Sequence, residues 1–341
     1  MDFQLTEEQA ALVAAVQTIL QDHMDLPQSA RLNSYYFDAK LQQLLDENGF
    51  LSAGRDIGPL EAALIVEESA RIPAVIEVSA SALVASQLLP DEQPAGPIAL
   101  VAGRSLRSAH RNLAIARTAF IDLGEDVAIV PVGAGDVVRV DSVLAYPFGR
   151  FVQPPDINSA RRLTGAGPRL RQWWRVALAA EFAGAAQSAV NFTLEHVKQR
   201  QAFGRPVGAF QAVQHRLVQC QIAATGVHWL ALRAAWSGEP HHADLAACYA
   251  QQHVRKLLVD LHQFTGAMGV TNEFLLHFWT YRLRALQSEA GGLNEVAQAV
   301  AHHRWGASSG NAVCRIRASQ SRNCAIPFAR CSIPRLISAP F

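Results

Sequence analysis

The chain has 341 residues, of which half are hydrophobic, and its 30 lysines and arginines are nearly balanced by 29 aspartates and glutamates. Such a chain is long and apolar enough to bury a core, so global disorder is excluded. The formal net charge is only +1, so there is no strong overall electrostatic attraction that would favour a nucleic acid or a membrane surface as the main partner. The five cysteines include no C-x-x-C pair, which argues against a zinc site and a disulfide framework.

The first 93 residues are predicted to be helical. Thr6 and Gln9 have the spacing of a capping box, and apolar residues follow at helical intervals. This acidic, amphipathic start is not a secretory signal, and no apolar run reaches the roughly 18 residues of a membrane-spanning helix. We therefore expect a soluble, cytoplasmic protein.

The composition changes twice further along the chain. Residues 94–155 contain short Val- and Ile-rich runs broken by Gly, Asp and Pro, which predicts a small β domain. Residues 156–306 return to long helical periods with short joins, as in a helical bundle. Residues 307–341 show neither the helical nor the strand periodicity of apolar residues and are predicted to be an irregular or disordered tail. The expected fold class is mostly α with a small β domain.

Two segments hold candidate binding residues. In "RQAFGRPVGAFQAVQHRL", Arg200 ends a long helix, where it could complement the helix dipole or grip a diphosphate. Phe203 turns the chain, and Gln211 begins the next helix with an amide that can donate and accept. In "HQFTGAMGVTNE", Gln263 and Gly266 break a helix, either as an ordinary turn or to let backbone approach a ligand.

These motifs, in this order and after "LTEEQAAL" at the start, resemble the acyl-CoA dehydrogenase family. The resemblance covers residues 1 to about 305 and is strongest after Trp173. It implies an FAD cofactor, gripped across a dimer interface by the arginine and the glutamine and backed by the glycine turn. The implied cofactor-binding residues are Arg200, Phe203, Gln211, Gln263, Gly266 and Ala267, the last standing where the family usually has a second glycine.

The catalytic base of that family has no clear equivalent in this chain. The family's enzymes remove the α-proton of an acyl-CoA with a glutamate while the flavin takes the β-hydride. Glu289 lies close to the usual position of the base but out of register, so it is a weak candidate. At the family's alternative position Arg175 is present, but Trp174 precedes it in place of a glutamate. The β domain also lacks the family's flavin-lining elements.

In lacking a clear catalytic base and the flavin-lining elements, this chain resembles the shorter, base-less subunit of α2β2 bacterial acyl-CoA dehydrogenases that act on steroid side-chain CoA thioesters. The resemblance implies a heterotetramer with a homologous partner, in which Arg200 and Gln211 are lent to an FAD held largely by that partner. Two alternatives stay open: a self-sufficient homo-oligomeric dehydrogenase with Glu289 as base, and a non-catalytic structural helical subunit. No metal, nucleic acid or membrane is expected as a ligand.

Overall fold

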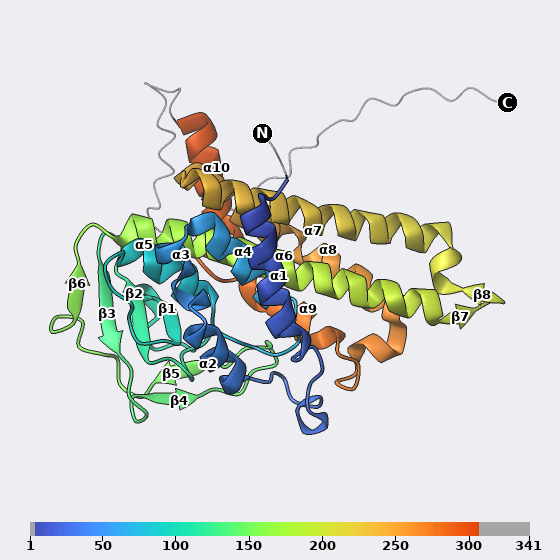
Figure 1. Cartoon of the computed structure of the whole chain (residues 1–341), viewed down its shortest axis with the longest axis horizontal. Coiled ribbons are helices and arrows are strands. Elements are labelled where there is room, and N and C mark those ends of the chain that lie inside the picture. The colour runs from blue at the N-terminus through green and yellow to red at the C-terminus, as the bar shows by residue number, and fades with distance from the viewer. Residues whose placement is uncertain (1–3, 307–341) are drawn as a thin grey trace, which may run out of the picture.

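The computed structural model describes residues 4–306 and shows a bundle of long helices with a small sheet packed at one end (Figure 1). The expected mostly α fold with a small β domain is confirmed, whereas the predicted tail, residues 307–341, lies outside the described residues. The α-helices are α1 (Glu7–Gln21), α2 (Ala39–Glu47), α3 (Ala53–Asp56), α4 (Pro59–Ser69), α5 (Ser86–Leu88), α6 (Gly167–Gln199), α7 (Gln211–Ser237), α8 (Pro240–Thr265), α9 (Leu276–Leu286) and α10 (Gly292–Trp305). Over residues 4–306, none of the helices has both the length and the apolar character needed to cross a bilayer.

The N-terminal helices form as their sequence signals predict. Thr6 accepts a hydrogen bond from the Gln9 amide at 3.2 Å, and the Gln9 side chain accepts one from the Thr6 amide at 3.0 Å, so the capping box of α1 is complete. Helix α4 lies inside the fold, with every residue from 62 to 69 buried. It packs between α1 and the long helix α6.

The segment after α4 departs from the expected α-helix. It forms a fully buried π-helix, η3 (Ser79–Ala85), followed by the short α5. The buried Glu77 carboxylate stands at its start and accepts hydrogen bonds from the backbone amides of Ala80 at 2.7 Å and Ile98 at 3.0 Å. Because Ile98 begins the first strand, Glu77 ties the helical unit to the sheet.

The strands of the small β domain form two sheets. One contains β1 (Ile98–Ala102), β2 (Thr118–Asp122), β3 (Val127–Pro131) and β6 (Arg161–Leu163), in the order β1-β2-β3-β6, while β4 (Val137–Arg139) and β5 (Gly149–Phe151) form a separate pair. Strand β1 pairs parallel to β2, and the other pairs are antiparallel. Strand β6 lies beyond residue 155, where the sequence pattern predicts the β domain to end; it is a short, arginine-rich edge strand without an apolar alternation.

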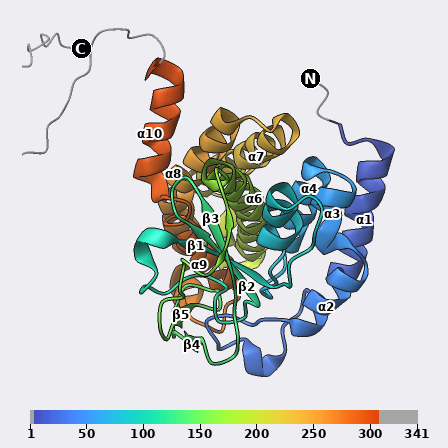
Figure 2. The same ribbon diagram turned by 90° about the vertical axis from the view of Figure 1, so that its left-hand side faces the viewer.

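The long helices of the bundle bring distant segments together. Helix α6 runs for 33 residues and packs against α7, α8, α9 and α4. At Gly184 a Cβ atom would lie 2.0 Å from the carbonyl oxygen of Glu67, so only a glycine allows α6 and α4 to approach this closely. Figure 2 shows the sheet in front of one end of α6, with α10 standing to one side.

We expect the Glu77 carboxylate to make stability depend on pH. Burial raises the pKa of Glu77 above its ordinary 4.5, against the opposing effect of its hydrogen bonds. Its contribution is therefore greatest below that value and is lost as the pH rises through the folded-state pKa. Glu77→Gln should be less stable than the wild type near pH 5, because its amide NH2 group would face the backbone N–H donors of Ala80 and Ile98, and this difference in stability should narrow as the pH rises.

Urea unfolding at a series of pH values tests this expectation. Glu47→Gln, which removes one exposed carboxylate, is the matched control and should keep the wild-type pH dependence. If the difference in the free energy of unfolding between the wild type and Glu77→Gln widens toward high pH, the assignment of a raised pKa to Glu77 is contradicted.

Candidate functional site

The β7–β8 hairpin at the far end of the bundle displays the first group of predicted site residues. Strands β7 (Gln201–Ala202) and β8 (Arg205–Pro206) are joined by Phe203 and Gly204, whose φ angles of 52° and 77° are both left-handed, as in a type I′ turn. The Phe203 side chain is 95% exposed at the tip. A large aromatic residue in a left-handed conformation is strained, so its display at this tip is a candidate functional feature.

Arg200 and Gln211 flank this hairpin and point away from the core. Arg200 ends α6, Gln211 begins α7, and both residues are exposed. Across residues 4–306 neither side chain makes a hydrogen bond or an ion pair, whereas Arg205 lies over the Phe210 ring at 4.1 Å. The hairpin therefore offers an unpaired guanidinium and an unpaired amide to a ligand from outside the described chain.

The glycine turn after α8 holds the second group. Gly266 has φ 59° and ψ −143°, a conformation that is essentially restricted to glycine. Ala267 follows in the 3-10 helix η6 (Gly266–Val270) outside the left-handed region, so its methyl group adds no backbone strain. Gln263 is exposed on the last turn of α8, and His262 fixes the turn by bonding to the Gly269 carbonyl at 2.8 Å.

The two groups lie at the same end of the bundle, opposite the sheet (Figure 1). The Arg216 guanidinium on α7 bonds to Asp260 on α8 at 3.1 Å and lies 5.0 Å from the Phe264 ring. These contacts hold the start of α7 against the end of α8. We call this end, which carries the hairpin and the glycine turn, the clamp end; it holds Arg200, Phe203, Gln211, Gln263, Gly266 and Ala267.

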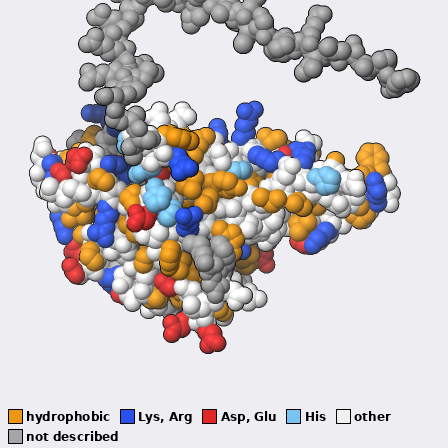
Figure 3. All heavy atoms as spheres, turned by 90° about the horizontal axis from the view of Figure 1, so that it is seen from above, with side chains coloured by type: hydrophobic (Ala, Val, Ile, Leu, Met, Phe, Trp, Pro, Cys, Tyr) orange, Lys and Arg blue, Asp and Glu red, His pale blue; other side chains and the backbone are white. Residues whose placement is uncertain are grey.

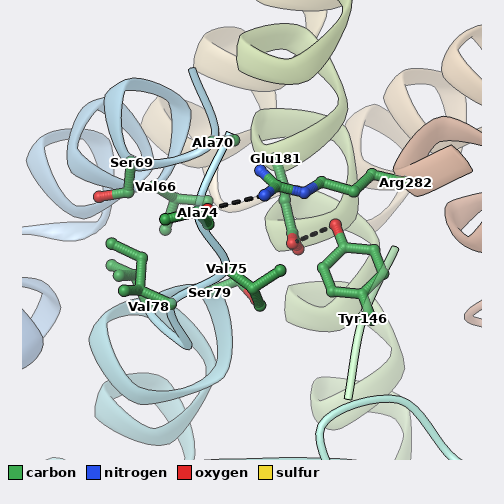
Figure 4. A pocket seen from close by; sticks show the side chains of 11 residues that line it. Val66, Ser69, Ala70, Ala74, Val75, Val78, Ser79, Tyr146, Glu181 and Arg282 are labelled. Carbon is green, nitrogen blue, oxygen red and sulfur yellow. Dashed lines mark hydrogen bonds between the residues drawn. The ribbon is translucent and has the colours of Figure 1, made fainter. Parts of the chain in front are cut away.

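The other predicted residues, Glu289 and Arg175, lie elsewhere, and Glu289 borders a buried ionic cluster where the sheet unit meets the bundle. Its centre is Glu181 on α6, which accepts hydrogen bonds from Arg111 at 2.8 Å and from the Tyr146 hydroxyl at 2.6 Å. Figure 4 shows the Tyr146 hydroxyl directed at Glu181, with Arg282 beside them. Arg282 donates to the backbone carbonyls of Ile72 at 2.8 Å and Ala74 at 2.7 Å.

This cluster fills the space between the units. The cavity that remains beside Tyr146, Glu181 and Arg282 has a volume of about 10 Å³, room for about one water molecule. Burial raises the pKa of Tyr146 well above 10, so its hydroxyl stays a neutral donor. Burial alone would lower the pKa of Arg111, but the carboxylates of Glu181 and Glu289 outweigh it and raise that pKa. The cavity that Glu181 lines therefore has no space for an acyl chain.

Glu289, the weak candidate for the base, belongs to the edge of this cluster. Its carboxylate accepts a hydrogen bond from the Trp174 indole at 3.2 Å and lies 3.6 Å from the Nε atom of Arg111. Burial raises the pKa of Glu289, and Arg111 opposes that shift. Arg175 is bound to Asp244 at 2.6 Å and to Glu295 at 3.5 Å, so it joins α6 to α8 and α10.

Sequence reasoning missed Arg111, Tyr146, Glu181 and Arg282. One signal was available, since "ALAAEFAGAA" places Glu181 in the middle of an alanine-rich helical run. A carboxylate at such a position must be buried, and a buried carboxylate requires a partner. The sequence alone does not identify that partner, because Arg111 lies in a distant loop before β2.

Comparison with known proteins points to one family. Residues 171–304 match the family model described as "Acyl-CoA dehydrogenase, C-terminal domain". Acyl-CoA dehydrogenase IpdE2 of Mycobacterium tuberculosis is 27% identical over 130 residues, which cover 38% of this chain and 41% of that protein. The match to this curated relative thus spans about two fifths of its length.

Solved structures share the fold over nearly the whole chain. The ChsE4-ChsE5 complex from Mycobacterium tuberculosis matches with a TM-score of 0.73 and 20% identity, covering 91% of this chain and 100% of that chain. A Tcur3481-Tcur3483 steroid ACAD variant matches with a TM-score of 0.75 and 20% identity, covering 89% of this chain and 99% of that chain.

The glycine turn yields a direct test of its backbone. Gly266→Ala should lower the free energy of unfolding by about 1–3 kcal/mol, because alanine is strained at this φ and ψ. The matched change one residue later, Ala267→Gly, should alter it by less than about 1 kcal/mol. Denaturant unfolding of both variants measures the difference, and equal effects would show that the turn does not depend on glycine.

Proposed function

Starting from the acyl-CoA dehydrogenase fold that this chain has, we propose that it is a subunit of an FAD-dependent acyl-CoA dehydrogenase. The complex catalyses α,β-dehydrogenation of an acyl-CoA thioester, and this chain lends Arg200 and Gln211 to an FAD shared with a homologous partner subunit. The contrast between the two ends of the chain carries the proposal: at the clamp end Arg200 and Gln211 are exposed and unpaired within the described residues, whereas the space beside Glu181 and Tyr146 holds only about one water molecule.

The side chains of the clamp end fit a flavin dinucleotide. The Arg200 guanidinium can grip two oxygens of a diphosphate, and Arg205 adds a second positive charge on the same hairpin. Gln211 and Gln263 supply amides, and Phe203 supplies an exposed ring for apolar contact. When bound, FAD would accept the hydride from the substrate; the residues of this chain would hold and orient it.

An apolar stripe on α7 supports a protein partner at the same face. Val218, Ile222, Trp229 and Trp236 are all exposed, and their spacings of four and seven residues place them along one side of the helix. Gln211 lies seven residues before Val218 and so shares that side. Figure 3 looks onto the face where α7 lies and shows hydrophobic side chains gathered across it. A subunit packed on this stripe would meet Gln211 at its end.

The descriptions of two solved structures with this fold support a proposal for the class of substrate. One is described as a steroid ACAD and another as a complex of two differently named chains. We therefore extend the proposal to a heterotetramer that acts on steroid side-chain CoA thioesters in steroid catabolism, as part of β-oxidation of lipids in the cytoplasm. In such an assembly the partner provides the catalytic base.

The self-sufficient alternative is less well supported by the geometry. Glu289 would have to act as base, but its carboxylate is bound by Trp174 and lies beside Arg111. Within residues 4–306, the cavity that Glu181 lines holds about one water molecule, and the larger cavity nearby is lined by Trp174 but not by Glu289. The structural-subunit alternative leaves the unpaired Arg200 and the strained, exposed Phe203 without a role.

Arg200→Ala should weaken FAD binding in the complex with the partner subunit by about 10- to 100-fold, as expected for loss of a charge-assisted hydrogen bond of about 1.5–3 kcal/mol. FAD retention is measured from the flavin absorbance of the purified complex during dilution. Arg169→Ala changes an exposed arginine at the opposite end of the same helix and is the matched control.

The isolated chain distinguishes the three functions. If the isolated chain binds little or no flavin and the complex with the partner binds it, this chain contributes residues to a shared FAD site. Stoichiometric flavin in the isolated wild-type chain would establish the self-sufficient enzyme if an acyl-CoA bleaches it. The same acyl-CoA should then leave the flavin of the Glu289→Gln variant unbleached. Unchanged flavin retention in Arg200→Ala would favour the structural subunit.

A further inference from the structure

Trp174 contacts two features that lie away from the clamp end. One is the Glu289 carboxylate, which its indole nitrogen contacts at 3.2 Å. The other is a cavity of about 610 Å³ between the sheet unit and the bundle, of which Trp174 is a wall. Ala290 and Gly291 also line this cavity, but Glu289 does not. The indole is thus a hydrogen-bonding partner of Glu289, and Trp174 is also part of the cavity wall.

Glu289 is the more loosely held of the two carboxylates beside Arg111. Glu181 receives two contacts of 2.8 Å from Arg111, whereas Glu289 lies 3.6 Å from Arg111 and 3.2 Å from the indole. The stronger partner of the guanidinium is therefore Glu181. Removal of the indole would leave Glu289 with its longer ionic contact and an open side.

The backbone after Glu289 has an unusual conformation. Ala290, Gly291 and Gly292 have φ angles of 52°, 99° and 73°, so three successive residues are left-handed. For Ala290 this conformation is strained, and such strain concentrates at ligand sites and switch regions. Ala290 lies in the chain between the buried Glu289 and helix α10, which begins at Gly292.

From these contacts we propose that Trp174 is a gate: its indole shields the Glu289 carboxylate from the 610 Å³ cavity, and displacement of the indole turns Glu289 into a hydrogen-bond and proton acceptor facing that cavity. The burial that raises the pKa of Glu289 is consistent with a carboxylate kept from water. This inference concerns contacts within one chain and does not rest on the proposed function.

The walls of the cavity indicate the class of ligand that would fit. Arg104 pairs with Glu295 at 3.0 Å and Arg171 with Asp122 at 2.8 Å, so the two guanidinium groups are already matched. Glu125 makes no ion pair with any residue in the range 4–306, and an uncovered Glu289 would add a further acceptor. The open cavity would therefore favour a small neutral or cationic hydrogen-bond donor over an anion.

Carboxylate labelling of the full chain tests the gate. The probe is a water-soluble carbodiimide with glycinamide, and peptide mass spectrometry quantifies the label on Glu289. Trp174→Gly should raise that label at least about tenfold over the wild type, because protection of this group depends on the local covering. Indole added at millimolar concentration should bind the space it vacates and reduce the label again.

Trp173→Gly is the matched control, since Trp173 is equally buried but lines a different depression, beside Gln87 and Pro240. Its Glu289 label should stay at the wild-type level. Equal labelling in the two variants, or a labelled Glu289 in the wild type, would overturn the gate. If circular dichroism shows that the glycine variants do not fold, the milder pair Trp174→Leu and Trp173→Leu gives the same comparison.

Discussion

The contact between the sheet unit and the bundle depends on one buried carboxylate, that of Glu181. Arg111 and Tyr146 reach it from two loops of the sheet unit, while Glu181 itself lies in the middle of α6. A buried charge of this kind is tolerated only when its partners are close and fully engaged. The position of the sheet against the bundle is therefore fixed by charge matching as well as by apolar packing. Arg282 extends the same network to the carbonyl groups that follow α4.

This network also divides the chain into two chemically different ends. Beside Glu181, the Arg111 and Tyr146 side chains are bound to the carboxylate, and the remaining space holds about one water molecule. At the clamp end, Arg200 and Gln211 are exposed and have no hydrogen-bonding or ionic partner within the described residues. A protein that used its own interior as a ligand site would show the reverse pattern. The distribution of unpaired polar groups is thus the main physical support for a function shared with another chain.

Local signals predicted much of the fold. The capping box at Thr6 and the turn at Phe203 and Gly204 are set by neighbouring residues, so the sequence was sufficient to anticipate them. The conformation of η3 and the pairing of β6 depend on packing between distant segments, and neither has a local pattern. Glu181 was identifiable as unusual, but its partners were not, because the contacts that neutralise it cross the whole of the sheet unit.

Helix α6 has a consequence beyond packing, because it is continuous from the ionic cluster to the clamp end. With a rise of about 1.5 Å per residue, Glu181 and Arg200 are held about 28 Å apart along one helix. The helix thereby fixes the distance between these two residues. A subunit that docks at the clamp end meets a point whose distance from the sheet unit is set by backbone hydrogen bonds alone. Insertion or deletion of even one residue between these points would also rotate Arg200 by about 100° around the axis.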